Sequence, residues 1–283
     1  MEYIWQETSF PDFKFDSSVL SLLIQDFAEQ LGETNGLFQG LSLAEQEELL
    51  VQISLTEAMK TSEIEGEYYS RLDVMSSIRN QLGLQNTLPK SKDLRVTAIA
   101  ELMIKVRADY SETLSLDMIK NWHSILMSNQ AHIQSGDWRK GNEPMQIISG
   151  AYGNFKVHYE APPSANVPEM MTSFINWYQS FSMESLGKIG EAMLKSAIVH
   201  LYFETINPFE DGNGRIGRAL AEKVLAENLE KPLYISISKI IEANKNAYYE
   251  ALKIAQRNLD ITEWLKYFFG IICSAELDVK SIA

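Results

Sequence analysis

Helical periodicity is the feature of this sequence that most constrains its fold. Apolar residues recur at steps of three and four along most of the chain, which places them on one face of an α-helix. The first such stretch starts at Ser17 or Ser18 and is expected to end at Gly32. The sequence therefore predicts a largely helical protein. Further helices are expected over residues 72–82, 94–110, 116–128, 168–181, 190–206, 213–228, 239–258 and 263–277.

A second helix is marked at both ends. Ser42-Leu-Ala-Glu45 has the pattern of a capping box, in which each side chain satisfies a backbone N–H group of the first turn. The helix can run to about Glu65, and Gly66 follows at the position where a left-handed residue commonly ends a helix. We expect this helix to belong to an N-terminal helical region over residues 1–90.

One region departs from the helical pattern. Residues 145–149 and 155–159 are two short β-prone runs joined by the glycine-rich segment 150–154. They predict a β-hairpin at about residues 145–160. The expected fold is therefore an all-α helical bundle with one β-hairpin and an N-terminal helical extension.

Charge and cysteine content exclude several classes of function. With 25 Lys and Arg against 38 Asp and Glu the net charge is −13, which disfavours binding to nucleic acid. Any phosphate ligand should therefore be small and bound locally. Cys273 is the sole cysteine, so a disulfide within the chain is impossible. The apolar runs are too short to cross a membrane and the first residues do not resemble a signal peptide, so a cytoplasmic protein without membrane contact is expected.

The segment Asp211-Gly-Asn-Gly-Arg215 predicts an anion site. It precedes the apolar pattern of a helix, and the first N–H groups of a helix lack partners and lie at its positive end. The glycines would let a ligand approach the backbone. Arg215 and Arg218 lie one turn apart, so both guanidinium groups are expected to face the same phosphate, and Asp211 could hold Mg²⁺. The alternative is a plain turn whose surface arginines pair with acids.

A longer string is more specific. Residues 203–218, Phe-Glu-Thr-Ile-Asn-Pro-Phe-Glu-Asp-Gly-Asn-Gly-Arg-Ile-Gly-Arg, resemble the signature of the Fic family, His-Pro-Phe-x-Asp/Glu-Gly-Asn-Gly-Arg-x-x-Arg, and depart from it at Asn207. The hairpin resembles the target-docking flap of that family, and residues 232–269 resemble its closing helices. The resemblance spans about residues 40–275 and implies a Fic core over residues 91–283.

The resemblance implies transfer of AMP from ATP to a protein hydroxyl, with release of pyrophosphate. Asp211 would hold Mg²⁺ on the phosphates, Arg218 would meet the γ-phosphate, and the flap at 145–160 would dock the target protein by strand addition. Phe209 would anchor the loop in the core. Gly212, Asn213, Gly214 and Arg215 would cradle the phosphates, and Tyr248 and Tyr249 could flank the adenine, although aromatic residues so placed more often pack in a core.

Asn207 stands where active members of the family have a histidine that accepts the proton of the target hydroxyl. A carboxamide takes no proton near neutral pH, and loss of a general base typically costs about 10²–10⁴ in rate. We therefore expect a retained ATP and Mg²⁺ site with impaired transfer, whether the asparagine is natural or introduced. His200 lies about 10 Å from Asn207 along the helix, too far to accept the same proton directly. It is expected to support the core. His158 is interpreted as a surface histidine on the flap, and His123 and His132 receive no role.

Thr61-Ser-Glu-Ile-Glu65-Gly66 resembles the inhibitory motif of the family, Ser/Thr-x-x-x-Glu-Gly/Asn. The resemblance implies that Glu65 pairs with Arg218 and so prevents productive placement of ATP. The plainer interpretation is that Glu63, Glu65 and Glu67 only solvate the end of a helix.

Two other functions stay open. The chain could be a pseudoenzyme that senses nucleotides or binds proteins without modifying them. Alternatively, Glu65 could activate water in a hydrolase that removes AMP from a modified protein. The target protein is not identified, and a homodimer is conceivable without a particular residue to support it.

Overall fold

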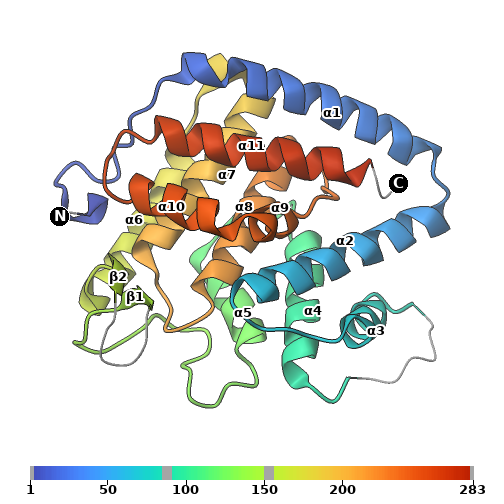
Figure 1. Cartoon of the computed structure of the whole chain (residues 1–283), viewed down its shortest axis with the longest axis horizontal. Coiled ribbons are helices and arrows are strands. Elements are labelled where there is room, and N and C mark those ends of the chain that lie inside the picture. Colours follow the sequence, from blue (N-terminus) through green and yellow to red (C-terminus); the bar gives the residue numbers. More distant parts are fainter. Residues whose placement is uncertain (1–2, 85–90, 150–155, 281–283) are drawn as a thin grey trace.

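Two adjacent helices, α7 (Gly187–Ile206) and α8 (Asn213–Leu229), form the centre of the molecule (Figure 1). The structure, a computed structural model, describes residues 3–84, 91–149 and 156–280. Every residue of α7 from 196 to 206 is buried. Because this helix is covered on all sides, the other elements must pack around it. The predicted all-α class with one small β-hairpin is confirmed.

The surrounding helices form two hydrophobic clusters, one on each side of the central pair. These helices are α1 (Ser21–Gly40), α2 (Leu43–Ile64), α3 (Arg71–Gln81), α4 (Leu94–Ala108), α5 (Leu116–Leu126), α6 (Val167–Ser180), α9 (Ile237–Ala243), α10 (Lys245–Ala255) and α11 (Thr262–Val279). Helix α2 contributes to both clusters: Leu49 and Ile53 pack with α1, α9, α10 and α11, whereas Val51 and Leu55 pack with α3 to α6. The N-terminal helices are therefore part of the same packed body as the rest.

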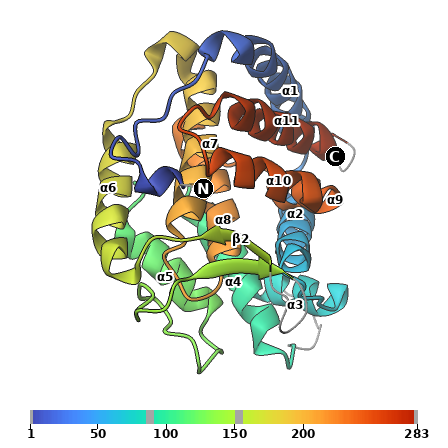
Figure 2. The ribbon, with the colours of Figure 1, turned by 60° about the vertical axis from the view of Figure 1, so that its left-hand side comes forward.

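The β-hairpin consists of β1 (Gln146–Ser149) and β2 (Lys156–Glu160), which pair antiparallel with a bulge between Ile147 and Ile148. It lies at the lower side of the molecule (Figure 2). The Tyr159 hydroxyl donates a hydrogen bond of 2.5 Å to the carbonyl oxygen of Thr205, so the hairpin is fixed to the last turn of α7. The predicted glycine-rich turn at 150–154 lies outside the described residues.

The predicted end of the first helix at Gly32 is wrong. Residues 17–20 form a short 3₁₀ turn, and α1 then continues through Gly32 and Gly36 to Gly40. A glycine inside a helix costs about 1 kcal/mol relative to alanine. Packing beyond Gly32 offsets this cost, because Thr34 is buried and the ring of Phe38 stacks on Tyr234 with centroids 4.1 Å apart.

The single helix predicted over residues 239–258 is also wrong. The structure divides this stretch at Asn244, which is the N-cap of α10 and accepts a hydrogen bond from the backbone N–H of Ala247. Asparagine favours such caps over helix interiors because its side chain can replace a backbone partner. The capping box at Ser42 and the left-handed Gly66 (φ 81°) are confirmed.

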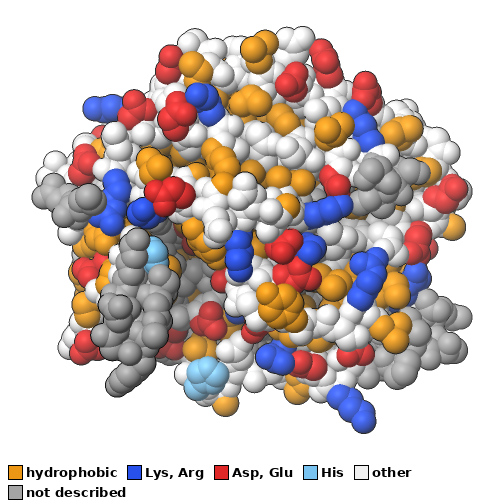
Figure 3. Space-filling model, in the orientation of Figure 1, with side chains coloured by type: hydrophobic (Ala, Val, Ile, Leu, Met, Phe, Trp, Pro, Cys, Tyr) orange, Lys and Arg blue, Asp and Glu red, His pale blue; other side chains and the backbone are white. Residues whose placement is uncertain are grey.

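The net charge of −13 predicts a surface without a large basic patch. On the face shown in Figure 3, acidic and basic side chains are intermixed and do not gather into a basic field. Within the described ranges, no helix has the length and apolar character needed to cross a bilayer.

Candidate functional site

The turn between α7 and α8 begins at Asn207, which has the left-handed conformation (φ 46°, ψ 65°) and ends α7. Asparagine tolerates this conformation better than most residues do. Its backbone N–H donates to the carbonyl oxygen of Phe203 at 2.9 Å, and its carboxamide donates to the carbonyl oxygen of Glu204. Asn207 is almost fully buried and lines a cleft to which the loop, the hairpin and α10 contribute.

Arg139 fixes this turn from the outside. Its backbone N–H donates to the carbonyl oxygen of Pro208 at 2.9 Å, and its Nε donates to that of Asn207 at 2.7 Å. The guanidinium also contacts the carbonyl oxygen of Pro162 and the hydroxyl of Ser164, just beyond the hairpin. Burial lowers the pKa of Arg139 to about 10. No sequence pattern indicated Arg139, because a lone arginine far from the loop carries no motif.

His123, to which the sequence analysis gave no role, lies under the loop. Its ring stacks on Phe209 with centroids 3.7 Å apart, and Phe209 is buried as predicted. Nδ1 accepts a hydrogen bond of 2.9 Å from the Gly136 N–H, which leaves Nε2 to donate to the carbonyl oxygen of Asp211 at 3.2 Å. Burial lowers the pKa of His123 to about 4, so the ring is neutral at pH 7.

The space beside both glycines of the loop is occupied by other side chains. Gly212 has a φ of 78°, and a Cβ on it would lie 2.3 Å from Cε of Met127. A Cβ on Gly214 would lie 2.3 Å from Oε1 of Glu65. The Asn213 carboxamide closes the loop, because it accepts from the N–H of Phe209 at 2.9 Å and donates to its carbonyl oxygen at 2.8 Å. The Asn213 side chain thus holds the loop in its shape.

Arg218 is buried and meets the end of α2. One of its terminal nitrogens lies 2.7 Å from Oε1 of Glu65 and donates to the carbonyl oxygen of Thr61 at 3.0 Å. Its Nε donates to the Thr61 hydroxyl at 2.9 Å. Burial alone would lower the pKa of Arg218, but the Glu65 carboxylate and other nearby groups raise it. The Glu65 carboxylate thus lies over Gly214, at the N-terminus of α8, as an anion would.

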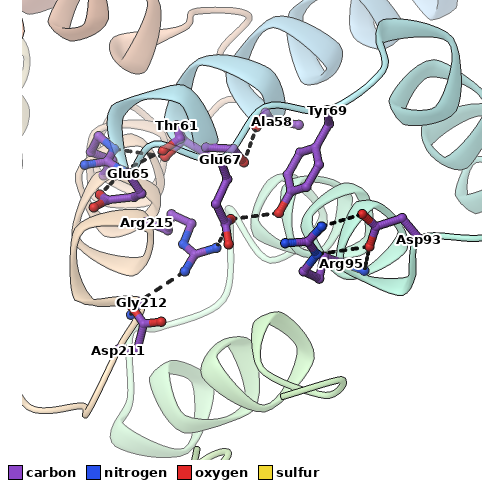
Figure 4. Close-up of polar contacts among 12 residues, drawn as sticks. Ala58, Thr61, Glu65, Glu67, Tyr69, Asp93, Arg95, Asp211, Gly212 and Arg215 are labelled. Carbon is purple, nitrogen blue, oxygen red and sulfur yellow. Dashed lines mark hydrogen bonds and ion pairs between the residues drawn. The ribbon is translucent and has the colours of Figure 1, made fainter.

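Arg215 does not face the cleft, contrary to the expectation that both arginines point to one ligand. Its NH1 lies 2.7 Å from Oε2 of Glu67, and its NH2 lies 3.7 Å from Oδ1 of Asp211 (Figure 4). The Tyr69 hydroxyl donates to the same Glu67 oxygen at 2.7 Å. Arg215 therefore joins the N-terminal region to the loop, and the cleft lining includes Arg218 without it.

The cleft has a volume of about 710 Å³, within the range of small-molecule sites. One wall is the loop and the start of α8, including Asp211, whose side chain is 51% exposed. The hairpin contributes Ile147 and His158. Helix α10 contributes Tyr248, which is buried and hydrogen-bonded to His200 at 2.8 Å, and Tyr249, which is 41% exposed.

Glu204 is a buried acid in the cleft wall that the sequence analysis did not single out. Its Oε1 has no hydrogen-bond partner among the described residues. Burial raises its pKa to about 8, although Arg218 partly opposes this shift. Its carboxyl group is therefore largely protonated at neutral pH. Within the described part of the chain, no group of three or more His, Cys, Asp or Glu side chains could hold a metal ion.

Two parts of the chain match known protein-family models. Residues 113–225 match the Fic/DOC family model, and residues 3–84 match a domain of unknown function, DUF4172. A probable protein adenylyltransferase of Aquifex aeolicus is 31% identical over 149 residues, which cover 50% of this chain and 45% of that protein. Protein adenylyltransferase fic-1 of Caenorhabditis elegans is 23% identical over 156 residues, 55% of this chain and 27% of that protein. The chain therefore spans less than half of these relatives.

Two solved structures share the fold. A Fic family protein from Desulfovibrio desulfuricans G20 superposes with a TM-score of 0.71 at 20% identity, over 96% of this chain and 77% of that one. A Fic domain-containing signaling protein from Bacteroides thetaiotaomicron gives a TM-score of 0.67 at 17% identity, over 91% and 95% of the two chains.

Proposed function

We propose, from the premise that residues 113–225 are a Fic/DOC family domain, that this chain binds ATP with Mg²⁺ in the cleft and transfers AMP poorly or not at all. The activity class follows relatives that carry the name protein adenylyltransferase. The observation that carries the proposal is the position of Asn207, whose side chain lines the cleft beside the start of α8.

The phosphates would bind at the N-terminus of α8. Gly212 and Gly214 line the cleft there, and Arg218 supplies a positive charge at its wall. The site of the Glu65 carboxylate, between Arg218 and Gly214, would receive a phosphate group. Tyr249 lines the cleft and could contact the adenine, whereas Tyr248 is buried against His200.

Asp211 fits a site for Mg²⁺. Its carboxylate lines the cleft, and its hydrogen bond from the Gly212 N–H and its ion pair with Arg215 both involve Oδ1. Magnesium bound with a nucleotide commonly takes one or two protein carboxylates and completes its shell with phosphate oxygens and water. When bound, the ion would neutralise charge on the phosphates.

In AMP transfer a hydroxyl oxygen of the target forms a bond to the α-phosphorus, the bond to the bridging oxygen breaks, and pyrophosphate leaves. The hydroxyl proton must pass to a base. The Asn207 carboxamide is held by the carbonyl oxygen of Glu204 and cannot accept this proton. The position is nevertheless compatible with histidine, which also tolerates the left-handed conformation.

Glu65 would act as an inhibitor of the same site. Its carboxylate forms an ion pair with Arg218. A γ-phosphate could bind Arg218 only after this ion pair breaks. A ligand that must first displace an internal group binds with reduced apparent affinity. Removal of the Glu65 side chain should therefore strengthen ATP binding.

The test compares the unaltered protein with Asn207→His, Glu65→Gly and the double variant. Calorimetry with ATP and Mg²⁺ should show affinity raised about tenfold or more by Glu65→Gly, equivalent to about 1.4 kcal/mol. With ATP labelled at the α-phosphate and cell extract, the double variant should label proteins about 10²–10⁴ times faster than Glu65→Gly alone.

Glu63→Gln is the matched control, because Glu63 pairs with Lys60 at 2.6 Å. Labelling by the unaltered protein at the rate of the double variant would contradict impaired transfer. Absence of ATP binding in every variant would contradict the nucleotide site. A protein that binds ATP and gains no transfer from Asn207→His would instead favour a nucleotide-sensing function.

A further inference from the structure

A second acidic side chain from the N-terminal region contacts the loop, beside the Glu65 contact. Glu67 accepts two hydrogen bonds on Oε2, from Arg215 and from the Tyr69 hydroxyl, both at 2.7 Å. The ring of Tyr69 in turn lies 5.6 Å from the guanidinium carbon of Arg95 (Figure 4). The Glu67 carboxylate is therefore held in place from two sides.

Arg215 lies between two carboxylates at unequal distances. The Glu67 contact at 2.7 Å is a hydrogen-bonded ion pair, whereas the nearest Asp211 oxygen is 3.7 Å away and does not form a hydrogen bond. The Arg215 side chain is only 4% exposed, and its Nε has no hydrogen-bond partner within the described ranges. A buried guanidinium stays charged, so it requires a nearby negative charge.

We propose that Glu67 is a positioning residue that neutralises Arg215 and thereby keeps the Asp211 carboxylate available to a metal ion in the cleft. This inference rests on the proposed function, because it assigns Asp211 to Mg²⁺. Without the charge of Glu67, Asp211 is the carboxylate left in contact with Arg215, and the 3.7 Å gap should close to a hydrogen bond. Asp211 would then be shared between Arg215 and the metal.

Glu65 and Glu67 should thus affect the site in opposite directions, although one residue separates them. Glu65 binds Arg218, which lines the cleft. The Glu65 carboxylate also occupies the space over Gly214. Glu67 binds an arginine that does not line the cleft. Loss of Glu65 frees a place for phosphate, whereas loss of Glu67 frees no place in the cleft and draws Asp211 away from it.

The test is Glu67→Gln in the Glu65→Gly background, with ATP and Mg²⁺ as probes. Glutamine keeps the shape and a hydrogen-bond acceptor for Arg215 while removing the charge. The Mg²⁺ concentration that gives half of the maximal enhancement of ATP binding should rise about tenfold, the lower part of the range for lost partners of metal ligands. ATP affinity in EDTA should stay unchanged. Glu63→Gln in the same background is the control with an equal change in charge.

Equal Mg²⁺ dependence with and without Glu67→Gln would overturn the inference. Tyr69→Phe provides a second variant, since it removes one hydrogen bond from Glu67 without a change in charge and should shift the Mg²⁺ dependence less, in the same direction. Crystal structures of the Glu67→Gln variant give a readout without nucleotide: the distance between Arg215 and Asp211 should fall below 3.7 Å. If ATP binds to none of the variants, the proposed function fails, and this distance alone decides the role of Glu67.

Discussion

The residue that departs from the family signature is also among the most constrained side chains of the loop. Asn207 combines a left-handed backbone, a carboxamide bonded to Glu204 and a carbonyl oxygen bonded to Arg139. Its neighbours therefore hold it independently of any ligand. The shape of the turn is therefore kept by a residue that takes no proton near neutral pH.

Glu204 should make stability depend on pH. Folding raises its pKa from 4.5 to about 8, so between these values the folded state holds a proton that the unfolded state releases. Stability should therefore fall as pH rises through this window. Glu204→Gln removes the effect and should be more stable than the unaltered protein by about 2–4 kcal/mol at pH 9, with little difference near pH 4.5.

Urea unfolding at several pH values measures this difference. Glu263→Gln is the control, because the Glu263 side chain is 79% exposed. Parallel pH profiles for the unaltered protein and Glu204→Gln would contradict an acid with a raised pKa in the cleft wall.

At the scale of elements, helix ends and helix interiors use glycine differently. Gly32 lies inside α1, where a Cβ would meet nothing within 4 Å, whereas Gly66 follows α2 with a φ of 81°. Both positions have space for a methyl group. They differ in backbone conformation, which decides whether replacement by alanine raises or lowers the stability of the protein.

Gly32→Ala should stabilise the protein by about 0.5–1 kcal/mol, because alanine loses less backbone freedom in a helix. Gly66→Ala should destabilise it by about 1–2 kcal/mol, the cost of a left-handed non-glycine residue. Thermal unfolding of the two variants beside the unaltered protein measures both effects. A stabilising Gly66→Ala would show that the end of α2 does not need the left-handed turn.

At the scale of the whole molecule, the N-terminal region and the core share one interior. Helix α2 places side chains in both hydrophobic clusters, and Glu57 from this helix accepts hydrogen bonds from Ser236 and Ser238. The predicted division near residue 90 stays a prediction. Residues on both sides of this division pack together in the same two hydrophobic clusters.

A fragment of residues 91–283 should therefore not unfold cooperatively, because it lacks Leu49, Val51, Ile53 and Leu55 from both clusters. Calorimetry and binding of an apolar dye would test this, with the full chain as reference. A fragment with a single sharp transition and little dye binding would show that the core folds without α2.

The sequence was sufficient for the fold class and for the location of the loop, because helical periodicity and the capping residues are local signals. It did not predict the continuation of α1 past Gly32, which depends on packing of Phe38 against a residue nearly 200 positions away. For the same reason it missed Arg139 and His123. Their contacts with the loop join distant segments, and a single sequence does not show such pairs.

The left-handed turn at Asn207 has a genetic consequence. Asparagine and histidine are among the residues that adopt this conformation most readily, and their codons differ in one nucleotide. If the base is the only part missing, a single point mutation could restore transfer without a cost to the fold. If Glu65 inhibits the site as proposed, the same contact with Arg218 would also restrain such a variant from modifying other proteins.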